Sequence, residues 1–326
     1  MQLDKTEIVI RERTTLELLD LSLVVVRRYW WPLLTASALI GLPLLALNLL
    51  MISWMLGDQG RMAAEDLGDP ETSMQQRFLL HLVALWYLEY PLASLPATIL
   101  IGNQIFFQRL SFRHLMVKLR PVIWRAVLVL GLLRAGLVGL GLELLVDRNV
   151  PFEPTIELFA LILACCGWAT LRRMSNPFAP EILGLETCKL MPRSKNELSY
   201  WRRCQNLHGL IAGDCVGRFF MSVLVVSSMV LMLYSIVFVS DFVGLRRTNS
   251  QFFNAMLSNQ ILIPLTFSIA MWLGGVFATV FRFLSYLDAR IRLEGWEVEL
   301  QMKAERGRLL QTLDPPPSRI VEAIVP

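Results

Sequence analysis

The sequence predicts an all-α integral membrane protein with six transmembrane helices and both termini on the cytoplasmic side. Hydrophobic residues make up 55% of its 326 residues, and charged residues make up only 18%. A helix needs about 20 mostly apolar residues to cross about 30 Å of hydrocarbon. Six stretches approach or exceed this length, namely 32–56, 78–102, 122–145, 156–171, 219–239 and 261–281.

The distribution of Lys and Arg predicts the orientation. With both termini inside, the predicted cytoplasmic segments hold 23 basic residues and the predicted outer loops hold 5, which is a strong positive-inside bias. The fourth stretch, 156–171, is short, and the alternative is that it lies partly buried among the other helices. The seven basic residues of the loop 172–217 would then lie outside, so we predict that it crosses. The net charge of +4 therefore indicates orientation and attraction to anionic lipid headgroups, and not nucleic-acid binding.

Residues 1–31 are predicted to form a cytoplasmic amphipathic helix along the membrane surface. Thr14 followed by Glu17 is a capping-box pattern, and apolar residues after it repeat at helical spacing. The first apolar run starts too late and is too long for a cleaved signal peptide, so we expect the first span to stay as an anchor. Residues 32–281 are predicted to form one membrane domain. The helix is expected to meet lipid headgroups through Arg27, Arg28, Trp30 and Trp31.

The cytoplasmic loop 172–217 is the most distinctive polar region. Pro177 and Pro180 oppose a continuous helix there, and Ser194 with Glu197 forms a second capping-box pattern. The helix that follows is predicted to lie at the inner interface, where lipid contact explains its composition and docking of another protein is the alternative. Its interfacial residues are Trp201, Arg202 and Arg203.

Residues 282–326 are predicted to continue the sixth span as a cytoplasmic helix with a tail. Asp288 and Arg292 are spaced for an i,i+4 ion pair. Arg218 and Arg282 lie near the cytoplasmic ends of their spans, and we expect their charged groups to extend to the interface.

Two charged residues fall deep inside predicted spans. Glu89 lies in the second span and Arg134 in the third, each eleven residues from the outer end. Charges near the bilayer centre are costly and face protein or water, and antiparallel spans would place these two at matching depth. The hypothesis is an interhelical ion pair between them, either purely structural or beside a polar cavity used for transport. Pro91 and Pro96 could break the second span locally.

Small residues at helical spacing predict close helix packing in two spans. The pattern occurs in the third span and in the sixth, where it could also mark a subunit contact. The residues are Ala135 and Gly139, and Ala270, Gly274 and Ala278.

Three blocks in the second half of the chain carry a resemblance to known proteins. They read "PFAPEILGLE", "RRCQNLHGLIAGDCVGRF" and "RFLSYLDARIRLEGWEVEL". They resemble segments of uncharacterised bacterial multi-pass inner-membrane proteins, and the last is similar to the end of a membrane domain that accompanies glycerophosphodiester phosphodiesterases. The catalytic domain of those enzymes has no counterpart here. The resemblance implies a bacterial inner-membrane location and brings no activity.

Motifs of the common enzyme classes are missing from the sequence, which has no Walker A loop, HExxH, GxSxG or dinucleotide fingerprint. Cys204 and His208 would share a helix face, but the spacing of further ligands does not fit a metal site. No cofactor or metal is expected.

Two function hypotheses follow from these features. The first is a non-enzymatic membrane subunit or scaffold that docks other membrane or cytoplasmic proteins. The alternative is a small transporter with a midplane site near Glu89 and Arg134. A membrane enzyme acting on lipid ranks third.

Overall fold

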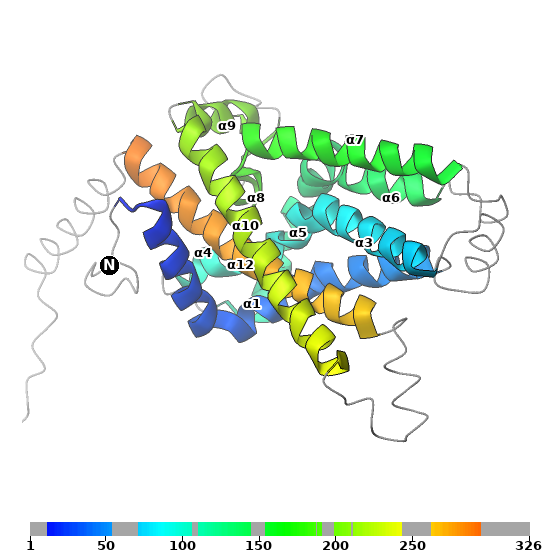
Figure 1. Ribbon diagram of the computed structural model, residues 1–326. Coiled ribbons are helices and arrows are strands. Elements are labelled where there is room, and N and C mark those ends of the chain that lie inside the picture. Colours follow the sequence, from blue (N-terminus) through cyan, green and yellow to red (C-terminus); the bar gives the residue numbers. More distant parts are fainter. Residues whose placement is uncertain are drawn as a thin grey trace, which may run out of the picture.

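The computed structural model describes residues 12–53, 71–105, 110–144, 154–186, 188–190, 199–209, 211–242 and 262–294. These residues are almost entirely helical and contain no strand, as the sequence predicts; an isolated bridge joins Lys189 and Ser199. Figure 1 shows a bundle of long helices. The elements are α1 (Thr15–Ile52), α3 (Glu71–Ala93), α4 (Leu95–Gln104), α5 (Phe112–Ala126), the π-helix η3 (Val127–Leu132), α6 (Gly136–Leu144), α7 (Pro154–Ser175), α8 (Ala179–Glu181), the π-helix η4 (Ile182–Glu186), α9 (Tyr200–His208), α10 (Ala212–Phe242) and α12 (Leu262–Glu294).

The start of α1 confirms the predicted capping box. The side chain of Thr14 accepts a hydrogen bond from the Glu17 backbone, and the Glu17 carboxylate accepts one from the Thr14 backbone at 3.2 Å. The helix then runs to Ile52 with a kink at Tyr29 (φ −113°, ψ 20°). The predicted boundary at residue 31 is therefore a bend within one helix. The second predicted capping box, Ser194 with Glu197, lies outside the described residues.

Three to five helices of the described chain are long and apolar enough to cross a membrane. Three of them, α1, α10 and α12, qualify individually. Two bent pairs qualify as units: α3 with α4, bent by 40°, and α5–η3 with α6, bent by 63°. The first bend lies between Pro91 and Pro96, where the sequence predicts a local break. The fourth predicted span corresponds to α7, which the structure shows as a helix of 22 residues.

The last long helix, α12, is the centre of the bundle. In its apolar window 72% of the residues are buried, against 11% for α10. It packs mainly against α1 and α10, and Figure 1 shows it crossing behind α10. The predicted small residues lie at this packing: Ala270 and Ala278 are buried, and a Cβ at Gly274 would come within 2.9 Å of the Val226 side chain. A Cβ at the adjacent Gly275 would come equally close to the Trp86 side chain of α3.

The other predicted small-residue pair lies between α3 and α6. A Cβ at Gly139 would meet the Leu88 side chain at 2.5 Å, and one at Gly136 would meet the Leu88 carbonyl oxygen at 2.9 Å. Ala135 is buried but precedes the helix, with a φ of 61°. Close backbone approach at this interface therefore depends chiefly on the two glycines.

Part of the predicted polar loop is inside the bundle. Residues 178–183 are buried, and α8 and η4 pack against α4 and α5. Glu181 is fully buried and bonded to Arg282 of α12 at 2.7 Å. Pro177 and Pro180 interrupt the helix as predicted, and the interruption turns this segment into the bundle.

Candidate binding site: an apolar cavity with four arginines

The structure contradicts the predicted Glu89–Arg134 ion pair. Glu89 accepts a hydrogen bond from Nδ2 of Asn48 on α1, with 2.7 Å between nitrogen and Oε2. Arg134 donates to the backbone carbonyl of Asn176 at the end of α7. The two side chains point to different neighbours and form no ion pair with each other.

A local change of helix geometry explains the error. The predicted pair required two straight helices with matched depth and register. Val127–Leu132 is a π-helix, and the chain then bends by 63° before α6. Arg134 lies in this break beside Ala135, whose positive φ is rare for a residue with a side chain. The direction of the Arg134 side chain is therefore set by the break and not by the periodicity of the span.

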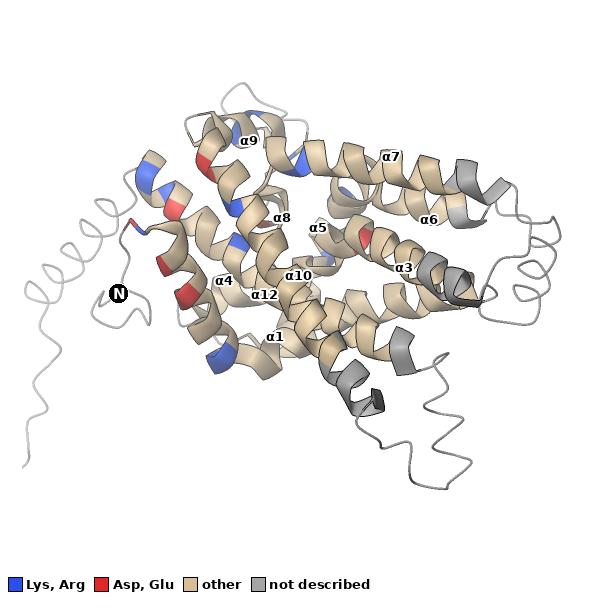
Figure 2. Ribbon diagram, viewed as in Figure 1, with Lys and Arg blue, Asp and Glu red and all other residues tan. Residues whose placement is uncertain are grey.

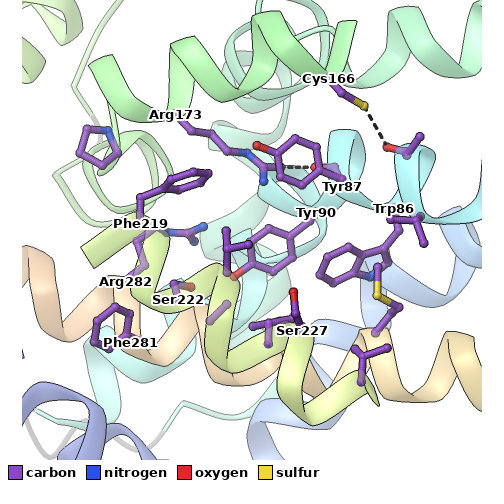
Figure 3. A pocket seen from close by; sticks show the side chains of 18 of the residues that line it. Trp86, Tyr87, Tyr90, Cys166, Arg173, Phe219, Ser222, Ser227, Phe281 and Arg282 are labelled. Carbon is purple, nitrogen blue, oxygen red and sulfur yellow. Dashed lines mark hydrogen bonds between the residues drawn. The ribbon is translucent and has the colours of Figure 1, made fainter. Parts of the chain in front are cut away.

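Arg134 instead lines a cavity of about 640 Å³ among α3, α7, α10 and α12. Figure 3 shows this cavity, with Arg173 and Arg282 among its labelled lining residues. Small-molecule sites have volumes of about 300–1,000 Å³. The walls are mostly apolar and aromatic. Trp86 and Tyr90 stack on one side with ring centroids 5.1 Å apart, and Phe219 and Phe281 line the cavity from α10 and α12. Four arginines also line it: Arg134, Arg173, Arg218 and Arg282.

Two of the four arginines have acidic partners. Nε of Arg282 lies 2.7 Å from Oε1 of Glu181, and Nη2 of Arg218 lies 2.5 Å from Oδ2 of Asp288. Arg282 also donates to Oγ of Ser94 at 2.9 Å. The sequence predicted that Arg218 and Arg282 would extend to the membrane interface, and this is wrong: both are held inside the bundle by buried carboxylates. The predicted i,i+4 ion pair is also present, with Nε of Arg292 at 3.1 Å from Oδ2 of Asp288.

The other two arginines have no carboxylate within ion-pair distance in the described part of the chain. Arg134 is 4% exposed and bonds the Asn176 carbonyl. Arg173 donates to the Tyr87 carbonyl, and its guanidinium lies 3.9 Å from the centroid of the Tyr87 ring. Such cation–π contacts stabilise a desolvated guanidinium by about 2 kcal/mol, but they leave its charge uncompensated. The cavity therefore carries two positive charges in excess.

Buried donors accompany this excess charge. Nε of Arg173 and Nε of Arg218 are buried and have no hydrogen-bond acceptor among the described residues. A buried donor without an acceptor costs about 1–3 kcal/mol, and more when the group is charged. An anion at this end of the cavity would supply acceptors and charge together.

The opposite end of the cavity is apolar and reaches the surface of the bundle. Three of its lining side chains are also well exposed, from 50% for Leu80 to 66% for Leu231. Thirteen residues of α10 separate Arg218 from Leu231, which is about 20 Å along a helix. The cavity is thus elongated, with arginines at one end and an apolar opening at the other. The three residues of the opening are Leu80, Leu163 and Leu231.

Most of the predicted interfacial residues lie on the surface. Six side chains are exposed, and the guanidinium of Arg172 lies over the Trp201 ring at 5.6 Å. Arg203 is the exception, because its Nε lies 2.6 Å from Oε2 of Glu186 and its side chain is 12% exposed. It links α9 to η4. The exposed residues are Arg27, Arg28, Trp30, Trp31, Trp201 and Arg202.

Cys204 and His208 lie four residues apart on α9. Cys204 is buried, and burial raises its pKa to about 11. Burial also lowers the pKa of His208. Among the described residues, no three His, Cys, Asp or Glu side chains gather as metal ligands would.

Sequence reasoning missed Arg173 as a site residue. It follows Arg172 in a basic pair at the predicted end of a span, which is typical of a membrane-interface pair. The spacing of residues on this helix could have indicated that Arg173 faces inward. Phe159, Cys166 and Arg173 are each seven residues apart, so they share a helix face, and all three line the cavity. Without the position of α3, this periodicity does not distinguish a cavity from a packed core.

No protein-family model matches the chain. Neither a curated protein nor a solved structure matches it. The resemblance of its three blocks to bacterial inner-membrane proteins therefore stays a prediction.

Proposed function

We propose that the protein is a non-enzymatic integral membrane protein that binds an anionic lipid in the arginine-lined cavity. The headgroup phosphate would lie at the arginine end, and the acyl chains would extend toward the apolar opening. The observation that carries this proposal is the pair of buried guanidinium groups, Arg134 and Arg173, that lack acidic partners at one end of an apolar cavity.

Phosphate is the anion that best fits this donor set. Guanidinium groups form paired hydrogen bonds with phosphate oxygens, and such charge-assisted bonds are roughly twice as strong as neutral ones. A small soluble anion would satisfy the arginines but would leave the apolar opening without a ligand. A lipid provides both parts and reaches the opening from within the membrane.

The proposed setting is the bacterial inner membrane, with six spans and both termini in the cytoplasm. Figure 2 supports this orientation, because charged residues gather at one end of the bundle, basic ones on α9 and at the end of α12 together with acidic ones at the start of α1. The described parts of α3, α6 and α7 at the other end carry few charges (Figure 2). The arginine end of the cavity lies toward the basic end of the bundle, so the lipid would come from the inner leaflet.

The two functions predicted from the sequence relate differently to this site. A small transporter would need such a binding site, although its residues would be the four arginines and not Glu89 with Arg134. A subunit or scaffold for other membrane or cytoplasmic proteins stays a prediction, with the exposed basic and aromatic residues of α1 and α9 as its docking surface.

A comparison of two adjacent arginines tests the lipid proposal. Arg173 lines the cavity, whereas Arg172 lies outside its lining and contacts the rings of Trp168 and Trp201. The delipidated protein would be titrated with a fluorescent phosphatidylglycerol. Hydrogen bonds to charged groups contribute about 1.5–3 kcal/mol, so Arg173→Gln should weaken binding about tenfold or more.

The matched variant Arg172→Gln should bind the lipid as the unmodified protein does. A zwitterionic lipid with the same acyl chains should bind more weakly to all three proteins. Equal affinity of the Arg173→Gln and Arg172→Gln proteins for phosphatidylglycerol would contradict the proposal.

A further inference from the structure

A second cavity, of about 40 Å³, lies among α1, α3 and α12. Trp86 and Tyr90 line both this cavity and the larger one. Its volume accommodates roughly two or three water molecules. Glu89 and Asn48 line it together with the hydroxyl-bearing residues Ser37, Ser94, Ser268 and Thr279.

Two acceptor oxygens in this cavity have no donor. Glu89 is 3% exposed and Asn48 is 2% exposed. The Asn48 amide donates to Oε2 of Glu89 at 2.7 Å, but Oε1 of Glu89 and Oδ1 of Asn48 are buried without a hydrogen-bond partner in the described structure. A proton or cation between them would satisfy both oxygens at once.

The charge of Glu89 is not balanced by the surrounding side chains. The polar lining residues of α1 are Ser37 and Asn48, and α12 contributes only neutral side chains. Tyr90 on α3 is the other titratable residue that lines the cavity. Arg282 touches the edge of the cavity through Ser94, but its Nε is held by Glu181 at 2.7 Å. A carboxylate this deep in an apolar bundle is unfavourable unless it binds a positive charge.

We infer that Glu89 and Asn48 form a binding site for one exchangeable monovalent cation, either a proton or Na⁺. Oε1 of Glu89 and Oδ1 of Asn48 are the ligating oxygens. A single carboxylate matches a single positive charge, and the small volume allows only an ion with one or two waters. The site is independent of the lipid proposal, because it uses neither Arg134 nor Arg173.

The thermal stability of the purified protein in phosphatidylcholine nanodiscs tests this site. The melting temperature would be measured from pH 5 to 9 in choline chloride and again in NaCl. If the ion is a proton, the folded protein holds it between Glu89 and Asn48 and the unfolded chain releases it, so in choline chloride the melting temperature should fall as the pH rises. If the ion is Na⁺, NaCl should raise the melting temperature at high pH by about 2–4 °C or more.

Glu89→Gln carries a neutral amide in place of the cation-bound carboxyl, so it should lose the fall with pH and any response to NaCl. Asp20→Asn, which changes an exposed acid on α1, should keep both. A pH response without a sodium response assigns a proton, and a sodium response assigns Na⁺. Identical pH and salt profiles of Glu89→Gln and the unmodified protein would overturn the inference.

Chemical labelling provides a second test that needs no variant. Dicyclohexylcarbodiimide modifies protonated carboxyl groups in apolar surroundings, and peptide mass spectrometry reports the modified residue. Modification of Glu89 should decrease as the pH rises, and NaCl should protect Glu89 only if the ion is Na⁺. Modification of Glu89 that is insensitive to both pH and NaCl would also overturn the inference.

Discussion

Nε of Arg282 lies 2.7 Å from Oε1 of Glu181, although the two residues are 101 positions apart in the chain. Glu181 belongs to the block "PFAPEILGLE" and Arg282 opens the block "RFLSYLDARIRLEGWEVEL". This ion pair therefore joins the first block to the third. The block "RRCQNLHGLIAGDCVGRF" is joined to the first block by the ion pair Glu186–Arg203 and to the third by Arg218–Asp288.

Removing one partner of the Glu181–Arg282 pair should strongly destabilise the protein. Glu181→Gln leaves the Arg282 guanidinium buried without a counter-charge, which costs about 3–5 kcal/mol in comparable buried pairs. The free energy of unfolding would be measured by titration with a denaturing detergent. Asp214→Asn serves as the control, because the Asp214 side chain is 56% exposed and its pair with Arg292 is 3.3 Å long. The control should change stability by less than about 1 kcal/mol, and an equal effect of the two variants would refute the expectation.

Three glycines of α6 should differ in their tolerance of alanine. A Cβ at Gly136 would lie 2.9 Å from the Leu88 carbonyl oxygen, which is part of the α3 backbone, so Gly136→Ala should destabilise by on the order of 1–3 kcal/mol. At Gly139 the clash is with the end of the Leu88 side chain, which can rotate, and the effect should be smaller. Gly141 has no neighbour within 4 Å, and Gly141→Ala should be neutral or stabilising because alanine favours helix. The same detergent titration ranks the three, and any other order would contradict the packing.

The Cys204 thiol should react slowly with maleimide in the folded protein. It is 3% exposed, and burial raises its pKa to about 11, so the thiolate fraction at pH 8 is roughly 0.1%. The reference is R202C in a background without other cysteines, because position 202 is exposed on the same helix. Its rate should exceed that of Cys204 at least about tenfold, and the two rates should converge when detergent unfolds the protein. Similar rates in the folded protein would contradict the burial of Cys204.

The side of the membrane that α9 faces decides between six spans and a fourth segment that does not cross. R202C should react with a membrane-impermeant maleimide only after the cells are permeabilised. D69C, in the first predicted outer loop, should react in intact cells. These expectations follow from the predicted distribution of basic residues. Labelling of R202C in intact cells would place the 172–217 loop outside and overturn the six-span prediction.

The helical architecture could be predicted from the sequence because length and hydropathy act over whole segments. The positions of the long helices, the Thr14–Glu17 cap and the small-residue packing of α12 all follow from local periodicity. The break in the second span was also readable, because Pro91 and Pro96 lack the backbone donors that a continuous helix needs.

The candidate site could not be predicted, because it depends on where helices bend and which neighbours they meet. No residue between Val127 and Leu132 signals a π-helix, and Ala135 has no sequence feature that predicts a positive φ. Asn48 is neutral, so no charge pattern in the sequence points to it as the partner of Glu89. Arg218 and Arg282 have the same sequence context as ordinary interfacial arginines, and only the fold brings Asp288 and Glu181 to them.

The long separation between Glu181 and Arg282 has a consequence for biosynthesis. Ribosomes add about 5–20 residues per second, so the 101 positions between these residues correspond to roughly 5–20 seconds. During that interval the nascent chain carries an acid that will be fully buried but whose partner, Arg282, has not yet been made. Glu181 must stay in contact with water, or with the insertion machinery, until α12 is delivered. Among the described helices, the central one, α12, is thus the last to be made, and the Glu181–Arg282 pair can form only once it is in place.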